Sequence, residues 1–244
     1  MEKTSYDVLI LSGPKDYNKI KYVYSSLLKN IRDPWNRIYV LTPTPPPETM
    51  PGISYVLDHE ALPLDLSPIK FRPNWVYQQF LKLFQRFTEC PYYLTVDADI
   101  IFNRPLQLFA DGRPLFQLGR DQQHPPYFAF MERLLGLKRS YPHSFINEFM
   151  LFRREFADEL AAALGGRDAF IEKSIKIIDS ECYPSEFEIY GNYVYSRHPG
   201  EYGISQLKSC TIGKEGSWSE LEIGELIRTM RSRDFDTFTM HSWD

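Results

Sequence analysis

The stretch Tyr92–Phe102, YYLTVDADIIF, places two acidic residues at the end of an apolar run. Alternate side chains of a strand lie on one face, so Asp97 and Asp99 leave the same side and Ala98 leaves a gap on the other. Two unit charges about 4 Å apart repel by about 4 kcal/mol at an effective dielectric constant of about 20. The pair therefore predicts a neutralising cation. Oxygen ligands favour Mg²⁺ or Mn²⁺, and Mg²⁺ commonly brings phosphates with it.

The segments before this stretch alternate between strand and helix patterns. Short apolar runs predict four strands, at Asp7–Ser12, Arg37–Thr42, Ile53–Leu57 and Tyr92–Val96. Apolar residues at helical spacing predict one helix from Tyr17 to Ile31 and another at Asn74–Phe87. Strands separated by helices predict an α/β fold with a mostly parallel central sheet flanked by helices.

The second half of the chain is less regular. It predicts a strand at Phe145–Phe152 and helices at Glu155–Leu164, Phe170–Ser180, Ser185–Tyr195 and Glu220–Ser232. The sequence has no internal repeat, low-complexity segment or flexible linker. We therefore expect one domain over residues 1–244, in which residues 1–105 form a nucleotide-binding half and residues 106–244 an acceptor-binding half with a C-terminal tail.

Composition narrows the functional class. The formal net charge of −4 gives no electrostatic footprint for nucleic acid. Cys90, Cys182 and Cys210 lack CxxC spacing, which indicates reduced thiols in a reducing compartment. The first residues show no signal peptide, and no apolar run approaches membrane-spanning length. We expect a cytoplasmic protein, and the sequence leaves peripheral membrane contact open.

Several polar residues follow the predicted strands. In parallel sheets, ligands bind beyond the carboxyl ends of the strands. Ser12, Asp58, Asp97 and Asp99 all lie at or near such ends. Gly13 permits close backbone approach to a ligand. Ordinary turn chemistry is the alternative explanation for Ser12, Gly13 and Asp58.

A strand–helix alternation that reaches Asp97-Ala98-Asp99 near residue 100 resembles the GT-A class of nucleotide-sugar glycosyltransferases. The segments SFINEFMLF (Ser144–Phe152) and SEFEIYGNY (Ser185–Tyr193) are similar to small bacterial or viral polysaccharide transferases of this class. The resemblance implies a single Rossmann-like domain. It also implies metal-dependent transfer of a sugar from a nucleotide-sugar, with UDP as the default, to a hydroxyl of a saccharide or glycolipid acceptor.

The resemblance also implies roles for individual residues. Asp99 would be the firmer metal ligand, and Asp97 would reach the metal, the ribose or both, with Ala98 between them at the donor. Several GT-A enzymes supply a late histidine as a further ligand, which is the role expected for His241 in the tail MHSW. An imidazole suits Mn²⁺ better than Mg²⁺. Trp243 would pack over the donor or merely anchor the tail.

The helix predicted at Asn74–Phe87 has a polar stripe as well as an apolar one. The stripe contains Trp75, Gln78, Gln79, Lys82 and Arg86. Lys82 could meet a diphosphate as a point charge, with Gln79 beside it. A solvated surface is the alternative, and it is the better explanation for Arg86.

The segment Ser185–Glu188 bears on the chemistry of transfer. Ser185 and Glu188 fit an S-x-x-E capping box, which gives Glu188 a structural role. Glu186 lies in the first turn, where the helix dipole favours its ionised form. We therefore favour Glu186 over Glu188 as the base that deprotonates an acceptor hydroxyl, as resemblance to inverting enzymes implies. A retaining enzyme needs no such base.

Weaker candidates surround these positions. His143, Glu148, Arg120 and Asp121 could line the donor or acceptor pocket. Tyr127–Phe130 would form an apolar lip for the acceptor or a corner of the core.

Two other functional classes compete with glycosyl transfer. A dehalogenase-type phosphatase also uses a DxD motif, but on the first strand, whereas three strands precede Asp97 here. A catalytically silent nucleotide- or sugar-binding domain on the same scaffold is the second. A sugar nucleotidyltransferase is disfavoured because Leu9–Tyr17, LILSGPKDY, lacks a glycine-rich, arginine-containing phosphate loop.

Overall fold

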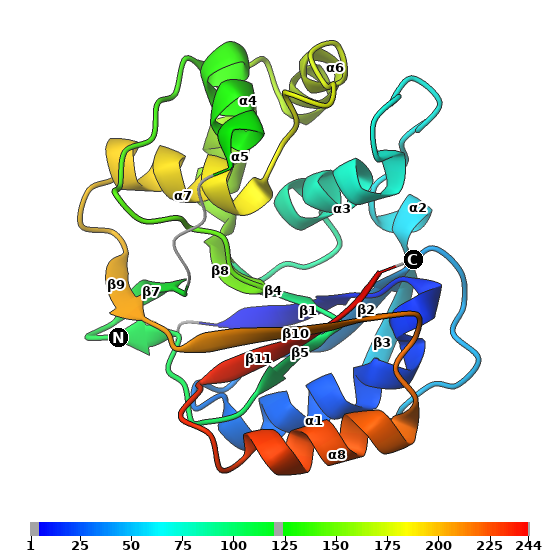
Figure 1. The fold of residues 1–244 in the computed structure, drawn as a ribbon. Coiled ribbons are helices and arrows are strands. Elements are labelled where there is room, and N and C mark those ends of the chain that lie inside the picture. The colour runs from blue at the N-terminus through cyan, green and yellow to red at the C-terminus, as the bar shows by residue number, and fades with distance from the viewer. Residues whose placement is uncertain (1–4, 120–123, 244) are drawn as a thin grey trace.

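The computed structural model describes residues 5–119 and 124–243, with the backbone alone at Trp243. Its central sheet has the strand order β3-β2-β1-β4-β8 (Figure 1). These strands are β1 (Tyr6–Leu11), β2 (Ile38–Thr42), β3 (Ile53–Leu57), β4 (Tyr92–Asp97) and β8 (Phe149–Arg153). The first four are parallel, and β8 runs antiparallel to β4 at the edge.

Two smaller sheets complete the strand architecture. One has the order β10-β11-β5, formed by Ser209–Glu215, Thr237–Trp243 and Ile100–Phe102. The other has the order β6-β7-β9, formed by Phe109–Ala110, Arg113–Leu118 and Gly203–Gln206. Each contains parallel and antiparallel neighbours. The predicted α/β class is therefore confirmed, but the sheets are mixed rather than mostly parallel, because β8 and β11 return from the second half of the chain in the opposite direction.

Helices cover both faces of the central sheet. On the lower side of Figure 1 lie α1 (Ile20–Asn30), which follows the short 3₁₀ helix η1 (Pro14–Lys19), and α8 (Glu220–Met230). On the upper side lie α3 (Pro73–Phe84), α4 (Pro125–Leu135), α5 (Arg154–Ala162), α6 (Arg167–Ile175) and α7 (Glu186–Arg197). The one-turn helix α2 (Asp58–Ala61) follows β3 directly.

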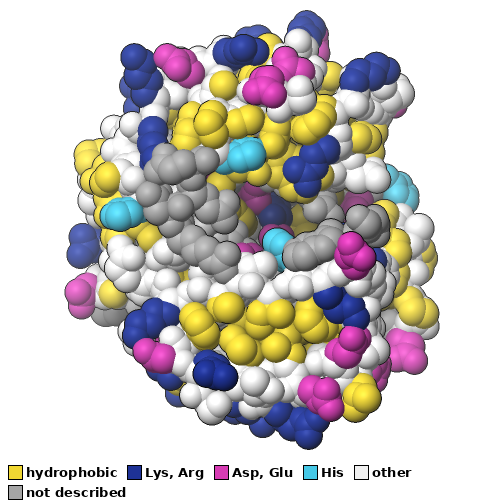
Figure 2. Space-filling view, in the orientation of Figure 1, with side chains coloured by type: hydrophobic (Ala, Val, Ile, Leu, Met, Phe, Trp, Pro, Cys, Tyr) yellow, Lys and Arg dark blue, Asp and Glu magenta, His cyan; other side chains and the backbone are white. Residues whose placement is uncertain are grey.

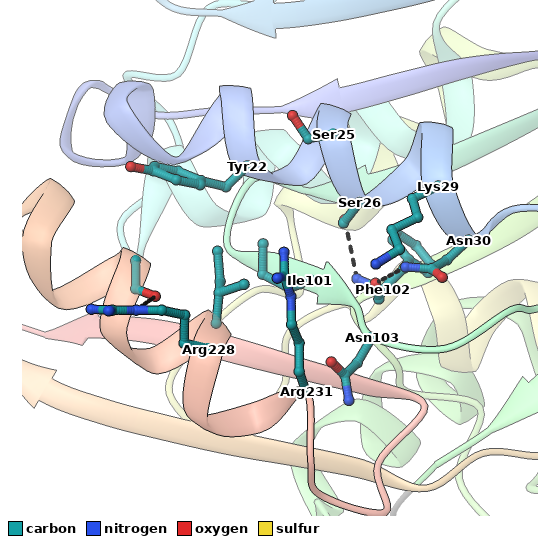
Figure 3. Close-up of a pocket in the computed structure, with 12 residues that line it drawn as sticks. Tyr22, Ser25, Ser26, Lys29, Asn30, Ile101, Phe102, Asn103, Arg228 and Arg231 are labelled. Carbon is teal, nitrogen blue, oxygen red and sulfur yellow. Dashed lines mark hydrogen bonds between the residues drawn. The ribbon is translucent and has the colours of Figure 1, made fainter.

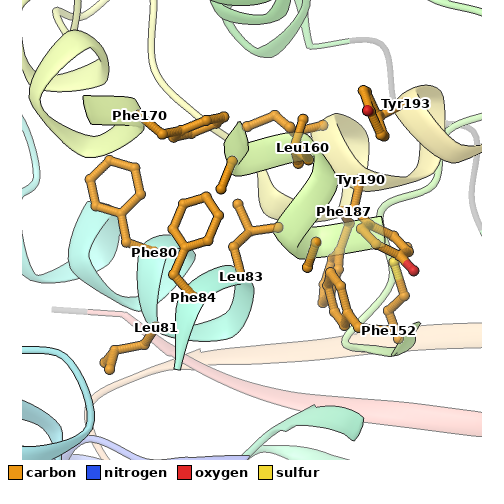
Figure 4. Packing of buried hydrophobic residues seen from close by; sticks show 14 of the residues in the cluster. Phe80, Leu81, Leu83, Phe84, Phe152, Leu160, Phe170, Phe187, Tyr190 and Tyr193 are labelled. Carbon is orange, nitrogen blue, oxygen red and sulfur yellow. The ribbon is translucent and has the colours of Figure 1, made fainter. Parts of the chain in front are cut away.

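The alternation of side chains along β1 divides the core in two. Val8 and Ile10 belong to the cluster shared with α1, β5, α8 and β11. Leu9 and Leu11 belong to the cluster shared with α3, α5 and α7, part of which Figure 4 shows. Apart from Asp7 near its start, both faces of this strand are apolar, as expected where helices cover a sheet on both sides. Burying each such side chain contributes about 1.5–3 kcal/mol.

Element boundaries differ from the predictions where side chains or prolines intervene. The first helix opens as η1 at Pro14 before the α-helix starts at Ile20. The strand expected at Phe145–Phe152 begins only at Phe149. Side-chain oxygens of Ser144 and Asn147 accept the backbone N–H groups of Ile146 and Glu148, so these donors are unavailable for a sheet ladder.

The expected return of the tail is confirmed. Strand β11 lies between β10 and β5 and buries Phe238 and Met240 in the lower core. Strand β10, which pairs with β11, was not predicted, because its side chains are half-exposed and carry little apolar periodicity. In the described parts of the chain, no helix has both the length and the apolarity needed to cross a membrane.

Close packing of α7 gives a stability prediction. A Cβ at Gly191 would lie 2.2 Å from Cγ of the fully buried Phe145. Overpacking of this kind costs about 1–3 kcal/mol. Because Gly191 also lies inside a helix, a propensity gain of about 0.5–1 kcal/mol offsets part of this cost, and we expect Gly191→Ala to lower the free energy of unfolding by about 1–2 kcal/mol in urea titrations.

Gly224 in α8 supplies the matched control, since a Cβ there would meet nothing within 4 Å. Gly224→Ala should raise the free energy of unfolding by about 0.5–1 kcal/mol through helix propensity. Equal stability of the two variants would contradict the packing argument.

Candidate functional site

A cavity of about 260 Å³ opens at the carboxyl ends of β1 and β4. Figure 2 shows this face hollowed between its upper and lower parts, with side chains of both charges at the floor of the hollow. The cavity brings together seven of the residues predicted from sequence. They are Gly13, Gln79, Lys82, Asp97, Ala98, Asp99 and His241.

Backbone hydrogen bonds fix the Asp97–Asp99 turn from three directions. Asp97 ends β4, and its N–H donates to the carbonyl of Glu148 at 2.9 Å. The N–H of Ala98 donates to the carbonyl of Leu11, at the end of β1. The carbonyl of Asp99 accepts from the N–H of Met240 in β11. The two carboxylates are therefore held at one wall of the cavity by the sheet itself.

Lys82 of α3 forms the charged centre of the site. Its Nζ lies 2.7 Å from Oδ1 of Asp97 and 2.6 Å from Oε1 of Glu186, the first residue of α7. Only 4% of the Lys82 side chain and 2% of the Glu186 side chain are exposed. Burial lowers the pKa of Lys82, but the carboxylates of Asp97 and Glu186 outweigh it, so the pKa stands above its ordinary value. Burial raises the pKa of Glu186, against the opposing effect of Lys82.

Asp99 and His241 form a second group on the same cavity wall. The Nε2 of His241 lies 3.6 Å from Oδ2 of Asp99, with side chains 48% and 17% exposed. Burial and then the charge of Asp97 raise the pKa of Asp99 well above its ordinary value. The charges of Asp16 and Glu148 act in the same direction. Burial and the neighbouring carboxylates therefore disfavour the ionised form of Asp99, which a cation bound there would favour.

The side chains of this second group carry oxygen and nitrogen atoms of the kinds that bind divalent ions. Within residues 5–119 and 124–243, no three His, Cys, Asp or Glu side chains form a complete metal site. Asp97 is paired with Lys82 and Asp16 with Lys19, whereas Asp99 lies beside His241, so these last two side chains could hold an ion together. Mg²⁺ is usually bound by one or two carboxylates plus substrate phosphates, and an imidazole suits Mn²⁺.

Two lysines hold the C-terminal strand against the site. Lys19 is fully buried, and its Nζ donates to Oδ1 of Asp16, the carbonyl of Met240 and Oγ of Ser242. Lys15 donates to the carbonyl of Ser242 at 2.9 Å. The backbone that carries His241 is therefore fastened to the segment that follows β1.

Sequence reasoning missed three charged residues of the cavity wall. Lys15 and Asp16 follow Gly13, and Arg72 precedes α3. The position of Lys15 and Asp16 just after β1 was an available signal. Arg72 gave none, because its side chain reaches the cavity from a left-handed backbone conformation with φ of 45° and lies over the Trp75 ring at 4.6 Å.

An aromatic cluster adjoins the cavity. Trp75 stacks on Tyr127 with ring centroids 6.0 Å apart and meets Tyr183 edge-on at 5.5 Å. Burial raises the pKa of Tyr127 to about 12, with the charges of Tyr183 and Glu186 acting in the same direction. Of the segment Tyr127–Phe130, Tyr127 thus belongs to this cluster, whereas Phe130 is fully buried in the core.

Other predicted residues lie away from the cavity wall. Ser12 is buried and donates to the carbonyl of Gly13, and Asp58 is buried at the start of α2. Glu188 is fully buried, and its carboxylate accepts from Ser144 and Asn192. Ser185 accepts from the N–H of Glu188, so the expected helix cap is formed on that side.

The remaining candidates have simpler outcomes. Arg120, Asp121 and the side chain of Trp243 lie outside the described residues. His143 is exposed beside Tyr141 rather than in the cavity. Arg86 is exposed and 3.5 Å from Asp158, as expected for a solvated surface residue.

The fold and the cavity define an α/β protein with a charged site at the carboxyl ends of its parallel strands. A model described as a family of unknown function (DUF6492) matches residues 15–195, and the chain belongs to this family. The match includes Lys82, Asp97, Asp99 and Glu186 and ends before His241. No curated protein matches the chain.

Removal of Lys82 should expose the cost of its buried partner. Breaking a buried ion pair from one side typically costs about 3–5 kcal/mol. We expect Lys82→Met to lower the free energy of unfolding by this amount in urea titrations, because Glu186 keeps a buried charge without its cation. Adding Glu186→Gln to that variant should restore much of the loss. An unchanged urea midpoint for Lys82→Met would refute the bridging role.

Asp58 should give stability a measurable pH dependence. Burial, which outweighs nearby His59, raises the pKa of Asp58 to about 6, above the value in the unfolded chain. Its favourable contribution is therefore present at low pH and is lost as pH rises through 6. Between pH 4 and pH 8, the free energy of unfolding of Asp58→Asn should rise by about 2–3 kcal/mol relative to that of the wild type, measured by urea unfolding.

Asp65 provides a control of opposite sign. Hydrogen bonds from the N–H and Oγ of Ser67 lower the pKa of Asp65. The Asp65→Asn variant should therefore lose stability relative to the wild type as pH rises. A parallel pH response of the two variants would contradict the assignment for Asp58.

Proposed function

We propose that this protein transfers a sugar from a nucleotide-sugar donor to a hydroxyl of a saccharide or glycolipid acceptor, with Mn²⁺ or Mg²⁺ as cofactor. One observation carries the proposal. Asp97 and Asp99 share a single cavity with His241 and with three cations, Lys15, Arg72 and Lys82. A parallel four-stranded core that ends at these acids also supports a GT-A fold.

The cations of the cavity would bind the diphosphate of the donor. Arg72 can present a planar pair of donors to a phosphate, and Lys82 a point charge. Gly13 leaves open space beside the backbone, since a Cβ there would meet nothing within 4 Å. The base and ribose of a nucleotide would lie there, at the carboxyl end of β1. UDP stays the default nucleotide on the strength of the resemblance alone.

A bound divalent ion would supply Lewis-acid stabilisation of the charge that develops on the leaving diphosphate. Asp99 and His241 would hold it, and phosphate oxygens would complete its shell. Asp97 would act through Lys82, which it positions at 2.7 Å beside the place where that charge develops. Holding donor and acceptor in line supplies much of the remaining rate.

The acceptor would lie against the cluster of Trp75, Tyr127 and Tyr183, whose rings present apolar faces next to Lys82. Glu186 is bound to Lys82 here. In an inverting reaction it would have to exchange Lys82 for the acceptor hydroxyl. In a retaining reaction it would keep holding Lys82. The pH–rate profiles of the wild type and of Glu186→Gln distinguish these cases. Glu186 contributes an ionisation to the wild-type profile only if it acts as the base.

The bridged state of Lys82 favours one alternative. Its ammonium is ion-paired with both Asp97 and Glu186, which is an arrangement that a catalytically silent nucleotide- or sugar-binding domain could also use. Such a domain would bind the donor without turnover.

The thiols Cys90, Cys182 and Cys210 are all free, which supports the proposal of a reducing, cytoplasmic location.

Binding and turnover can be tested separately. Thermal-shift screening of UDP-, GDP- and dTDP-sugars with and without Mn²⁺ should reveal metal-dependent stabilisation of about 2.7 kcal/mol at a hundredfold excess over Kd. Release of the nucleoside diphosphate in the presence of saccharide acceptors measures turnover. Asp99→Asn should reduce turnover by about a hundredfold or more.

Asp158→Asn, at an exposed carboxylate of α5, is the matched control and should leave both readouts unchanged. Binding without turnover would support the silent domain. Metal-independent turnover that survives in Asp99→Asn would overturn the proposed role of the acids.

A further inference from the structure

A second cavity, of about 310 Å³, lies between α1, β5 and α8. It shares no lining residue with the candidate site. Figure 3 shows α1 on one side, α8 on the other and the short strand β5 between them. Because none of its residues enters the proposed transfer reaction, a ligand there would constitute a separate function.

The floor of this cavity is mainly apolar. Ile101 and Phe102 of β5 and Ile227 of α8 form it, with the ring of Tyr22 at one end. Ligand pockets of about 300–1,000 Å³ with apolar walls and a few polar groups are typical of small-molecule sites. The size and the wall therefore suit a small apolar group.

A glycine keeps this cavity open. Gly224 lies inside α8 and lines the cavity, and a Cβ there would meet nothing within 4 Å. Glycine inside a helix costs about 1 kcal/mol relative to alanine. No steric contact among the described residues requires glycine at this position. A larger side chain would instead project into the cavity.

The charges at the rim all have one sign. Lys29 of α1, Arg228 of α8 and Arg231, directly after α8, line the cavity, and no Asp or Glu is among its lining residues. In Figure 3 the side chains of Lys29 and Arg231 extend into the space between the helices. Within the described ranges neither makes an ion pair, whereas Arg228 is 3.9 Å from Glu225. Cations that converge without a counter-ion repel one another, and an anion would relieve that repulsion.

We propose that this cavity binds an anionic amphiphile. The apolar part would lie on Ile101, Phe102 and Ile227, and the phosphate or carboxylate group would lie between Lys29 and Arg231. An apolar floor suits a ligand with an apolar part better than a purely ionic ligand. A cationic rim suits an anionic group better than a neutral one. Either a monomeric amphiphile or a lipid of a bilayer has this chemistry.

Titration calorimetry on the full chain with octyl phosphate tests the proposal. Octyl glucoside matches the chain without the charge, and inorganic phosphate matches the charge without the chain. We expect octyl phosphate to bind at least about tenfold more tightly than either. Lys29→Gln and Arg231→Gln should each weaken it by about tenfold, since both side chains are exposed and charge removal leaves the fold intact.

Gly224→Met should abolish binding by filling the cavity, and its thermal unfolding temperature shows whether the variant stays folded. Lys176→Gln, at an exposed lysine of the α6 end paired with Glu172, is the control and should bind as the wild type does. Binding no tighter than that of inorganic phosphate, or binding that tolerates both Gly224→Met and Arg231→Gln, would overturn the proposal.

Vesicles distinguish the two sources of the ligand. Co-sedimentation with phosphatidylglycerol vesicles, but not with phosphatidylcholine vesicles, that is lost in Gly224→Met assigns the site to a bilayer lipid. Octyl phosphate binding without such co-sedimentation assigns it to a monomeric amphiphile. Neither result depends on nucleotide-sugar binding, so this inference and the proposed transfer activity stand or fall separately.

Discussion

The ammonium of Lys82, held between Asp97 and Glu186, is the interaction on which the rest of the site depends. It joins α3, β4 and α7 at one buried point. Removing such charges from water is expensive, and the attraction repays the cost only when the geometry is good and both partners are present. The three elements are therefore fixed relative to one another by electrostatics as well as by the apolar packing of α3 against α7.

The strands and helices of the first half follow from the sequence because their signals are local. Asp7–Ser12 and Ile53–Leu57 are short apolar runs, and the structure places β1 and β3 there within a residue. The direction of β8 and the pairing of β11 with β5 depend on contacts more than 50 residues apart in sequence, which no local pattern encodes. For that reason the sequence did not predict that the sheets are mixed.

The candidate site also contains residues that the local sequence indicated and residues that it did not. Asp97 and Asp99 were indicated by their place at the end of a strand, and Lys82 by the polar stripe of the helix that precedes them, and the cavity brings the three together. Arg72 depends on a left-handed backbone conformation before Pro73, which is unfavourable locally and is imposed by the surroundings. Glu188 fitted a helix cap, but its carboxylate turned instead to Ser144 and Asn192, where burial offers stronger bonds.

The wall that carries His241 belongs to β11, which Lys15 and Lys19 tie to the segment after β1 across more than 220 residues of sequence. A ribosome that has made only the first two hundred residues has produced every strand of the central sheet but not this wall. The nascent protein thus has its central sheet before the last strand of the lower core and the wall of its pocket. Until translation reaches Ser242, Lys19 lacks two of its three acceptors, and the cavity lacks the strand that fastens His241 to its edge.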